Sequence, residues 1–166
     1  MVIRLASPED LPGILEILNR EIREGYAHFS VESVTLAAIE QEFAQAGNLP
    51  WMVADQDCEI LGFARANPWK SRGGYRHTCE VGVYVRPEAQ GQSVGSRIYE
   101  AMIPELKARG FKTLLAGVAL PNPASVRLHE RFGFRQVGTL PQVGWKQGAW
   151  RDVGYWALTF DRPDPE

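Results

Sequence analysis

The sequence predicts a single α/β domain built on a mixed β-sheet. The length of 166 residues is typical of one domain, and 45% of the residues are hydrophobic, as in ordinary globular proteins. Segments with apolar residues at helical spacing are interspersed with shorter apolar segments typical of strands. Their order is strand, two helices, three strands, helix, strand, helix and two strands. Hairpins and helical crossovers in one chain indicate both antiparallel and parallel strand pairs.

The first half of the chain is expected to hold four of these strands and two helices. Ser7 followed by Pro8 is typical of a helix N-terminus, because a hydroxyl caps free amides and proline suits the first turn. The expected elements are a strand at Val2–Leu5, a first helix ending near Gly25, a second helix over Val31–Ala46, and strands at Trp51–Ala54, Ile60–Pro68 and His77–Arg86. In the last of these strands, alternation puts Glu80, Gly82 and Tyr84 on one face.

The second half is expected to hold three strands and two further helices. Gly110 and Gly133 follow the expected helix ends, as is typical of helix C-termini. The expected elements are a helix over Val94–Arg109, a strand at Thr113–Leu120, a helix over Ala124–Phe132, and strands at Phe134–Gly144 and Val153–Phe160. We therefore expect one domain over residues 1–160 and a loose polar tail over residues 161–166.

Charge and composition exclude several classes of partner. Eighteen basic and 20 acidic residues give a net charge of −2, so no basic excess favours nucleic acid or anionic lipid. No apolar run approaches the ~18 residues that a membrane span needs. Cys58 and Cys79 have no ligand spacing with each other or with the three histidines, so we expect reduced thiols and no metal site. The sequence thus predicts a soluble, cytoplasmic protein.

The segment from Val83 to Ser96 joins an expected strand to the next helix through a loop of small residues. A helix N-terminus presents unpaired amides and the positive end of the helix dipole, so it can bind an anion such as a phosphate. Gly91 and Gly95 allow the backbone to approach a ligand closely. The loop lacks the lysine of a Walker motif and the glycine spacing of a Rossmann fingerprint. A plain strand-to-helix turn is the alternative.

Two segments resemble the cofactor motifs of the GNAT superfamily of N-acetyltransferases. Gln90-Gly-Gln-Ser-Val-Gly95 resembles the superfamily's Q/R-x-x-G-x-G/A loop, which binds the pyrophosphate of acetyl-CoA. Ser93 departs from this pattern, and its hydroxyl can either crowd the phosphate or donate to it. Asn122-Pro-Ala-Ser-Val-Arg-Leu-His129, followed by Gly133-Phe134, resembles the second cofactor segment. The resemblance implies the GNAT fold, with a splayed central sheet flanked by helices, and acetyl-CoA as the acetyl donor.

A narrower resemblance, to the phosphinothricin acetyltransferase family, covers nearly the whole chain. It includes the run Val143-Gly-Trp-Lys-Gln-Gly-Ala-Trp150-Arg-Asp152-Val. Relatives in this family acetylate methionine sulfoximine and methionine sulfone. The resemblance therefore implies an enzyme that acetylates the α-amine of a small amino acid. It also implies a homodimer in which the neighbouring subunit completes the acceptor pocket, and the aromatic-rich hairpin Val143–Phe160 is a candidate interface.

The resemblance also implies which residues bind acetyl-CoA. Strand amides are expected to pair with the pantetheine arm, the loop to hold the pyrophosphate, and residues of the second segment to complete the site. The expected cofactor residues are Val83, Tyr84, Val85, Gly91, Gln92, Ser93, Val94, Gly95, Ser96, Asn122 and Arg131. Arg131 is equally well explained as a solvated residue on a helix face.

Two residues are candidates for catalysis. Glu80 is a carboxylate within an apolar strand, where burial raises a pKa and suits the group to act as a base; the matching glutamate of the family is a proposed base. The alternative is a structural glutamate paired with Arg72 or Arg76. His129 stands where many superfamily members carry the tyrosine that protonates the leaving thiolate, and an imidazole can donate near neutral pH. The alternative is a hydrogen-bonded histidine without a chemical role.

The acceptor site is expected around one basic loop and the strand that carries the candidate base. The resemblance implies that the substrate residues are Lys70, Ser71, Arg72, Glu80, Val81 and Gly82. Two cations and a hydroxyl can neutralise a carboxylate, although a solvated loop is the alternative. Phe29, Trp51 and Trp69 are candidate walls of the pocket, although aromatic residues at such sites more often belong to the core. Trp150 and Asp152 are interpreted as structural, the first packing and the second satisfying a turn.

The sequence thus predicts direct acetyl transfer in a ternary complex with a small amino acid, without a cysteine nucleophile. The first alternative is another amine acceptor: a polyamine, an aminoglycoside or a protein N-terminus. Lys70 and Arg72 argue against a polycationic acceptor. The second alternative is a non-catalytic acetyl-CoA sensor, against which the retained Glu80 argues.

Overall fold

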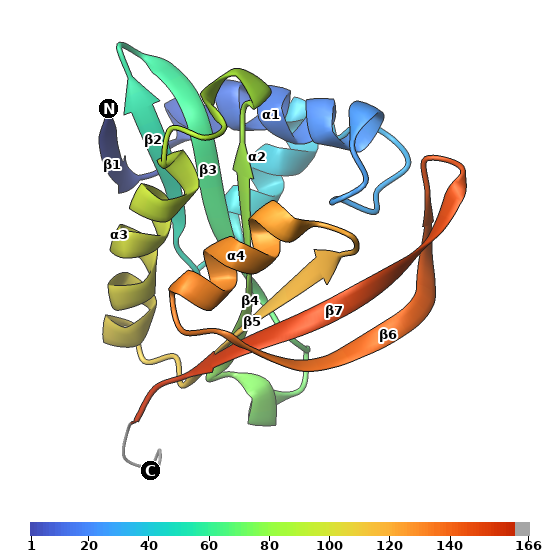
Figure 1. Ribbon diagram of the computed structural model, residues 1–166. Helices are drawn as coiled ribbons and strands as arrows, with labels where there is room; N and C mark the ends of the chain where they lie inside the picture. Colours follow the sequence, from blue (N-terminus) through green and yellow to red (C-terminus); the bar gives the residue numbers. More distant parts are fainter. Residues whose placement is uncertain (162–166) are drawn as a thin grey trace.

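A seven-stranded mixed sheet with helices on both faces forms the fold (Figure 1). The computed structural model describes residues 1–161, so the predicted tail lies, except for Asp161, outside the described residues. The strands are β1 (Val2–Leu5), β2 (Trp51–Gln56), β3 (Glu59–Pro68), β4 (Thr78–Val85), β5 (Thr113–Ala119), β6 (Arg135–Lys146) and β7 (Ala149–Thr159). The helices are α1 (Leu11–Glu24), α2 (Leu36–Ala44), α3 (Val94–Ala108) and α4 (Pro123–Arg131). The predicted order of elements is confirmed.

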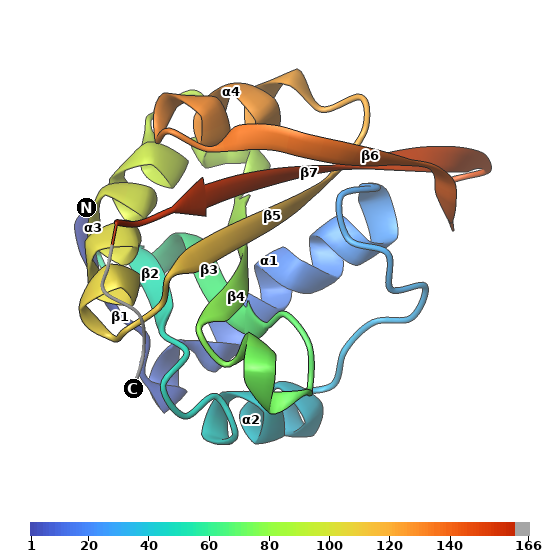
Figure 2. The same cartoon turned by 90° about the horizontal axis from the view of Figure 1, so that it is seen from below.

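Two apolar layers enclose the sheet (Figure 2). On one face, Ile14 of α1 and Ile39 of α2 pack against β2 and β3. On the other face, α3 contributes Ile98. The predicted alternation along β4 is confirmed, since Cys79 belongs to the α3 layer and Tyr84 packs against the α1 layer. Over residues 1–161, no helix combines the length and apolar character that a membrane span requires.

The second helix is shorter than predicted, because it begins at Leu36 and not at Val31. The side chain of Asn19 in α1 bonds both the N–H and the carbonyl of Val34, at 2.7 and 2.8 Å, and holds the preceding residues as a loop. Thr35 then caps the helix with its side chain. The contact joins residues 15 positions apart, so local periodicity could not indicate it.

β6 and β7 form a longer hairpin than predicted. β6 continues to Lys146, and β7 begins at Ala149 and not near Val153. The two turn residues, Gln147 and Gly148, both have positive φ, at 52° and 69°. This is the backbone that a two-residue hairpin turn requires, and it lets the strands pair up to the turn.

β4 and β5 diverge in the middle of the sheet. They pair in parallel at three positions, from Thr78 with Thr113 to Glu80 with Leu115. The other strand pairs are antiparallel, which makes the sheet mixed, as predicted. Beyond Glu80, no described residue of β5 pairs with β4, so the edge of Val81–Val85 that faces β5 lacks a strand partner. The splayed sheet implied by the resemblance is confirmed.

Candidate active site

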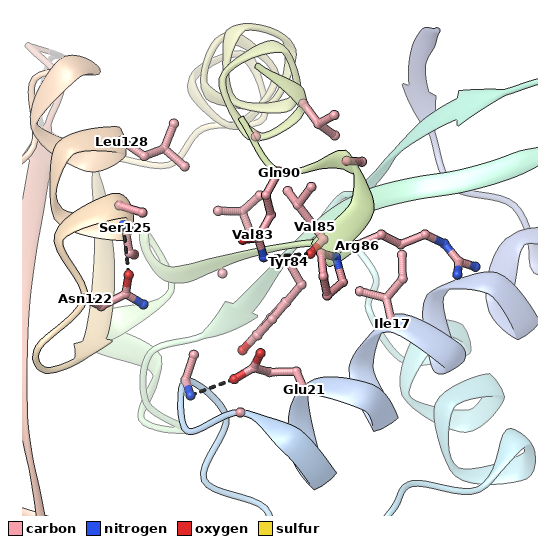
Figure 3. A pocket seen from close by; sticks show the side chains of 18 of the residues that line it. Ile17, Glu21, Val83, Tyr84, Val85, Arg86, Gln90, Asn122, Ser125 and Leu128 are labelled. Atoms are coloured by element: carbon pink, nitrogen blue, oxygen red, sulfur yellow. Dashed lines mark hydrogen bonds between the residues drawn. The ribbon is translucent and has the colours of Figure 1, made fainter. Parts of the chain in front are cut away.

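A cavity of about 670 Å³ opens where β4 leaves β5 (Figure 3). Its walls come from α1, β4, the loop before α3, the end of β5, and α4. The expected cofactor residues that line it are Val83, Tyr84, Val85, Gly91, Ser93, Val94, Gly95, Ser96, Asn122 and Arg131. Gln92 is not among the lining residues, and its side-chain amide donates to the Glu88 carbonyl at 2.9 Å. The fold therefore brings the two motif segments to one cavity.

The loop before α3 offers backbone amides to this cavity. Gly91 and Ser93 have left-handed backbone, with φ of 76° and 62°, and Ser93 is the N-cap of α3. A left-handed backbone suits glycine and is costly for other residues. This explains why the family motif carries glycine at the position of Ser93. The amides of Val94, Gly95 and Ser96 lie in the first helical turn and have no helical acceptor. This end of the cavity is suited to an anionic group.

α4 forms the opposite wall of the cavity. It begins after Asn122, whose side-chain oxygen accepts from the Ser125 amide at 3.1 Å and caps the helix. Arg127 and Arg131 lie one turn apart, exposed, among the lining residues. The sequence analysis missed Arg127, although its spacing of four residues from Arg131 on one helix could have identified it.

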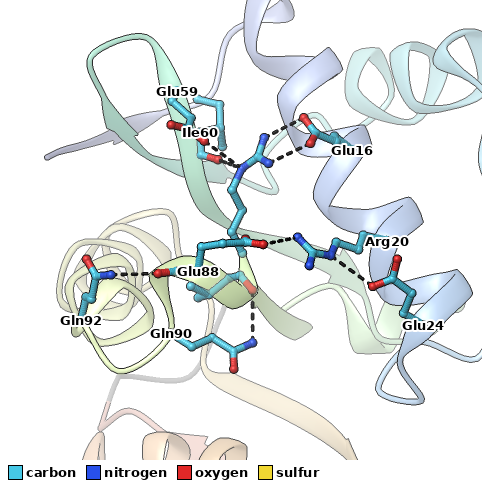
Figure 4. Close-up of polar contacts among 10 residues, drawn as sticks. Glu16, Arg20, Glu24, Glu59, Ile60, Glu88, Gln90 and Gln92 are labelled. Carbon is cyan, nitrogen blue, oxygen red and sulfur yellow. Dashed lines mark hydrogen bonds and ion pairs between the residues drawn. The ribbon is translucent and has the colours of Figure 1, made fainter.

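Ion pairs fasten the loop before α3 to α1 (Figure 4). Arg86, which follows β4, donates through both Nη atoms to Glu16 of α1 at 2.8 and 2.7 Å, and through Nε to the Ile60 carbonyl at 2.7 Å. These hydrogen bonds lower the pKa of Glu16. Arg20 of α1 contacts Glu88 of the loop, with 2.6 Å between Nη1 and Oε1. This network was not predicted, because its members are up to 70 residues apart in the sequence.

Glu80 lies where the two strands separate. It is half-buried, and an added Cβ on Gly117 of β5 would lie 2.8 Å from its Oε1. Burial raises the pKa of Glu80, while a hydrogen bond from the Gly117 backbone and the charge of Lys70 act in the opposite direction. Lys70 is thus a cation that acts on Glu80, and it was not among the suggested partners Arg72 and Arg76.

The neighbours of Glu80 place its carboxylate at the rim of the cavity. Glu80 is not itself a lining residue, whereas Val81, Gly82 and Gly117 are. Tyr155 of β7 lies on the same side, because an added Cβ on Gly117 would be 2.8 Å from Glu80 Oε1 and 3.4 Å from Tyr155 Cε1. Burial and the charge of Glu80 raise the pKa of the Tyr155 hydroxyl. Of the predicted substrate residues, the structure thus brings Glu80, Val81 and Gly82 together.

The predicted substrate loop Lys70–Arg72 is exposed and contributes no lining residue. The Lys70 Nζ lies 4.8 Å from the centroid of the Trp69 ring, which in turn packs edge-on against Tyr155 at 5.5 Å. Lys70 is therefore on the Glu80 side of the sheet. Ser71 and Arg72 are not brought into the cavity.

Tyr84 and Glu21 face each other across the cavity floor (Figure 3). The Tyr84 ring stacks on Phe63 at 5.3 Å, and burial raises the pKa of its hydroxyl to about 12. Glu21 of α1 accepts a hydrogen bond from the Ala27 amide at 2.8 Å. The Tyr84 side chain was expected only as a wall of the cleft. Glu21 was not predicted, because no local pattern shows that this residue of α1 lies beside β4.

His129 is held by hydrogen bonds within the protein. Its Nδ1 lies 2.7 Å from the Ser125 carbonyl, and its Nε2 lies 2.9 Å from the Tyr99 hydroxyl. A carbonyl can only accept, so Nδ1 carries the proton and Nε2 accepts from Tyr99. The side chain is 3% exposed, and burial lowers its pKa. His129 nevertheless lines the cavity; this geometry favours the hydrogen-bonded histidine, and the role of proton donor stays a prediction.

The two cysteines differ in environment. Cys79 is buried in the α3 layer, and burial raises the pKa of its thiol to about 12. A neutral thiol is a poor nucleophile. Cys58 is exposed in the β2–β3 turn with φ of 67°. Neither thiol lines the cavity, in keeping with the predicted direct transfer.

Several aromatic predictions are corrected. Trp51 is not a pocket wall; it is 3% exposed and packs between Phe43 and Arg65. Trp150 does not pack into the core; it is 58% exposed and contacts Trp145 on the hairpin. The structural role of Asp152 is confirmed, since its Oδ1 accepts from the Gln142 amide, at a residue with positive φ, at 2.8 Å.

The acetyltransferase (GNAT) family model matches residues 11–134, from the start of α1 to the residue before β6. The chain belongs to the GNAT acetyltransferase family. The matched region contains both cofactor segments and Glu80. This GNAT protein is accordingly an acetyl-CoA-dependent N-acetyltransferase.

Other GNAT proteins are similar along nearly the full chain. Phosphinothricin N-acetyltransferase of Streptomyces viridochromogenes is 37% identical over 98% of this chain and 90% of its own. L-methionine sulfoximine/L-methionine sulfone acetyltransferase of Pseudomonas aeruginosa is 36% identical over 96% of this chain and 94% of its own. An acetyltransferase of Salmonella typhimurium, solved with acetyl-CoA, has a TM-score of 0.92 and 31% identity and covers 99% of this chain and 96% of its own. The narrower resemblance is confirmed.

Proposed function

We propose that this GNAT acetyltransferase transfers acetyl from acetyl-CoA to the α-amino group of a small amino acid or analogue, such as phosphinothricin, methionine sulfoximine or methionine sulfone. The observation that carries the proposal is the half-buried carboxylate of Glu80 at the divergence of β4 and β5. The names of two relatives support the acceptor class, because each denotes an amino-acid analogue with an α-amine.

The cavity suits acetyl-CoA as the acetyl donor. We assign the pantetheine arm to the unpaired edge of Val83–Val85, which offers a ligand the amide and carbonyl groups that a further strand would bind. The pyrophosphate is assigned to the amides of Gly91–Ser96. Arg127 and Arg131 stand at the exposed rim, where guanidinium groups can bind further phosphate oxygens. A volume of about 670 Å³ is that of a typical ligand pocket.

In this mechanism Glu80 acts as the general base. Its carboxylate takes one proton from the α-ammonium group, directly or through one water, and its raised pKa makes this transfer easier. The freed amine attacks the thioester carbon, the carbon–sulfur bond breaks, and an amide forms. The second proton of the nitrogen neutralises the thiolate. A thiol pKa of ~8.5 makes this group able to leave without a positioned acid, so His129 is not needed as a proton donor.

The acceptor's carboxylate is assigned to the exposed basic loop. Lys70 lies on the Glu80 side, and Arg72 follows it in the loop. A cation here attracts an α-carboxylate and repels a polyamine. Lys70 is one side of the acceptor site, and the backbone of Val81 and Gly82 is another.

We also propose that the enzyme is a homodimer through the β6–β7 hairpin. The exposed apolar residues of this hairpin are Val137, Leu140, Val143, Trp145 and Trp150. Exposed apolar and aromatic side chains gathered on one hairpin are typical of a subunit interface. Sedimentation should detect dimers of the unchanged protein and monomers of Trp150→Arg. Val2→Arg, at an apolar residue equally exposed on β1, is the control and should remain dimeric.

Thiol release with a panel of acceptors tests the enzymatic proposal. We expect turnover with methionine sulfone, methionine sulfoximine or phosphinothricin and none with spermidine or an aminoglycoside. Tight acetyl-CoA binding without turnover of any amine would instead favour a sensor. Turnover confined to a peptide N-terminus would contradict the small acceptor.

A further inference from the structure

The end of α1 and the loop after it lie beside the β6–β7 turn (Figure 2). This segment, Glu21–Ser30, forms one side of the cavity through Glu21, Gly25 and Ala27. The turn belongs to the run Val143–Asp152, which resembles the phosphinothricin acetyltransferase family. The cavity contacts described above give no role to that run, so its contacts with Glu21–Ser30 require an explanation.

Two side chains of the β6–β7 turn bond the carboxyl end of α1. Lys146, which is 5% exposed, donates from Nζ to the Ile22 carbonyl at 2.7 Å and also to the Ser30 carbonyl. Gln147 donates from Nε2 to the Arg23 carbonyl at 2.8 Å. The last carbonyls of a helix have no partner within it, and a positive charge is favourable there. The two side chains therefore fix where α1 ends and where the following loop returns.

Gly144 leaves space for the aromatic ring of Phe29 in the loop after α1. An added Cβ at this glycine would lie only 2.1 Å from Cε1 of Phe29, so the Phe29 ring occupies the space that a side chain would fill. Farther along the hairpin, the guanidinium of Arg151 lies 4.2 Å from the centroid of the Tyr26 ring. Four residues of the run thus contact one loop across more than 110 positions of sequence.

The segment held in this way carries groups that face the reaction site. The Glu21 carboxylate points toward the Tyr84 hydroxyl (Figure 3), and the Ala27 amide holds that carboxylate by a hydrogen bond. The His28 ring lies 6.0 Å from the Tyr84 ring. Burial raises the pKa of Tyr84, and the charges of Glu21 and Glu80 add to this effect, so both carboxylates act on one tyrosine.

We propose that Gly144, Lys146 and Gln147 are positioning residues for the acceptor. They hold Glu21–Ser30 against the β6–β7 hairpin and so set the wall that aligns the acceptor amine with Glu80. The inference rests on the proposed function, since it concerns the acceptor half of that reaction. It assigns no contact with the acetyl donor to the three residues.

Gly144→Ala tests the proposal, with Gly138→Ala as the matched control. Both glycines lie in β6, but an added Cβ at Gly138 meets no atom within 4 Å. We expect Gly144→Ala to raise the acceptor KM by about tenfold or more, because a wall displaced by an ångström misaligns the reacting groups. The acetyl-CoA KM should stay within twofold, and Gly138→Ala should leave both constants unchanged. An equal rise in both KM values, or none, would overturn the proposal.

Gln147→Ala keeps the test valid if Gly144→Ala does not fold, because Gln147 is exposed. Its expected effect is a smaller rise in the acceptor KM alone. Hydrogen exchange of both variants supplies a readout independent of turnover. Faster exchange should be confined to residues 21–30, and unchanged exchange there would refute the positioning role. If the unchanged enzyme acetylates no amino acid, the proposed function fails, while the exchange data still report whether the hairpin holds the segment.

Discussion

The two sides of the β4–β5 opening are built from different kinds of group. The cofactor side consists mainly of backbone: the free edge of β4 and the first-turn amides of α3, within residues 83–96. The acceptor side consists of side chains from α1, β4, β5 and β7 and from the loops after α1 and β3. Backbone groups can bind a constant ligand whatever the side chains are, whereas side chains can vary with the acceptor. This difference explains why the groups of the cofactor side lie in one short motif, whereas those of the acceptor side come from several separate segments.

The largest expected effect is at Glu80, where the two sides meet. Glu80→Gln keeps the shape and removes the base, so kcat should fall by about 10²–10⁴-fold. The acetyl-CoA KM should change little. Because the pKa of Glu80 is raised, the activity of the unchanged enzyme should fall with decreasing pH through a pKa above 4.5, and this acid limb should be absent from the variant. If Glu80→Gln kept nearly the full kcat, Glu80 could not be the general base.

Tyr99→Phe should affect the cofactor side only. It removes the donor to His129 and leaves a buried acceptor unpaired, which should lower the free energy of unfolding by about 1–3 kcal/mol. The bond joins α3 to α4, so the acetyl-CoA KM should rise while the acceptor KM stays constant. Urea unfolding and steady-state kinetics measure both, and Tyr75→Phe, at a residue 44% exposed, is the control. A change in the acceptor KM alone would contradict this division.

His28 should make the acceptor side sensitive to acid. Burial, with the charges of Arg65 and Lys146, lowers the pKa of His28 from 6.5 to about 4. Between these values the unfolded chain binds a proton that the folded protein does not, so stability should fall as the pH decreases from 6.5 to 4. His28→Asn should remove about 1 kcal/mol of this loss, a value reduced for the solvent that reaches the ring. Urea unfolding at pH 7 and 4.5 measures this loss of stability. If the unchanged protein and His28→Asn lost the same free energy of unfolding, His28 would not be the source of the acid sensitivity.

The smallest expected effect is at Ser93. Ser93→Gly relieves the left-handed backbone but adds freedom to the unfolded chain, so the free energy of unfolding should change by less than about 0.5 kcal/mol. If the hydroxyl crowds the phosphate, the acetyl-CoA KM should fall about twofold to threefold. We expect this outcome because the motif carries glycine here. A rise in KM would show that the hydroxyl donates to the phosphate.

The sequence by itself determined the order of the elements, the two faces of β4 and the strand–loop–helix segment before α3, whose free amides suit an anion. These features depend on neighbouring residues: alternation places side chains on opposite faces, and a helix start leaves its own amides free. Two predictions from local pattern were wrong. The second helix begins at Leu36 and not at Val31, and Trp150 is exposed and not packed.

Only the tertiary structure decided the contacts that give the site residues their roles. It joined His129 to Tyr99, placed Glu80 beside Gly117, and brought Lys146 to the end of α1, 124 residues away. A hydrogen bond depends on distance in space, and that distance is set by how all the elements pack. No periodicity within a segment encodes it.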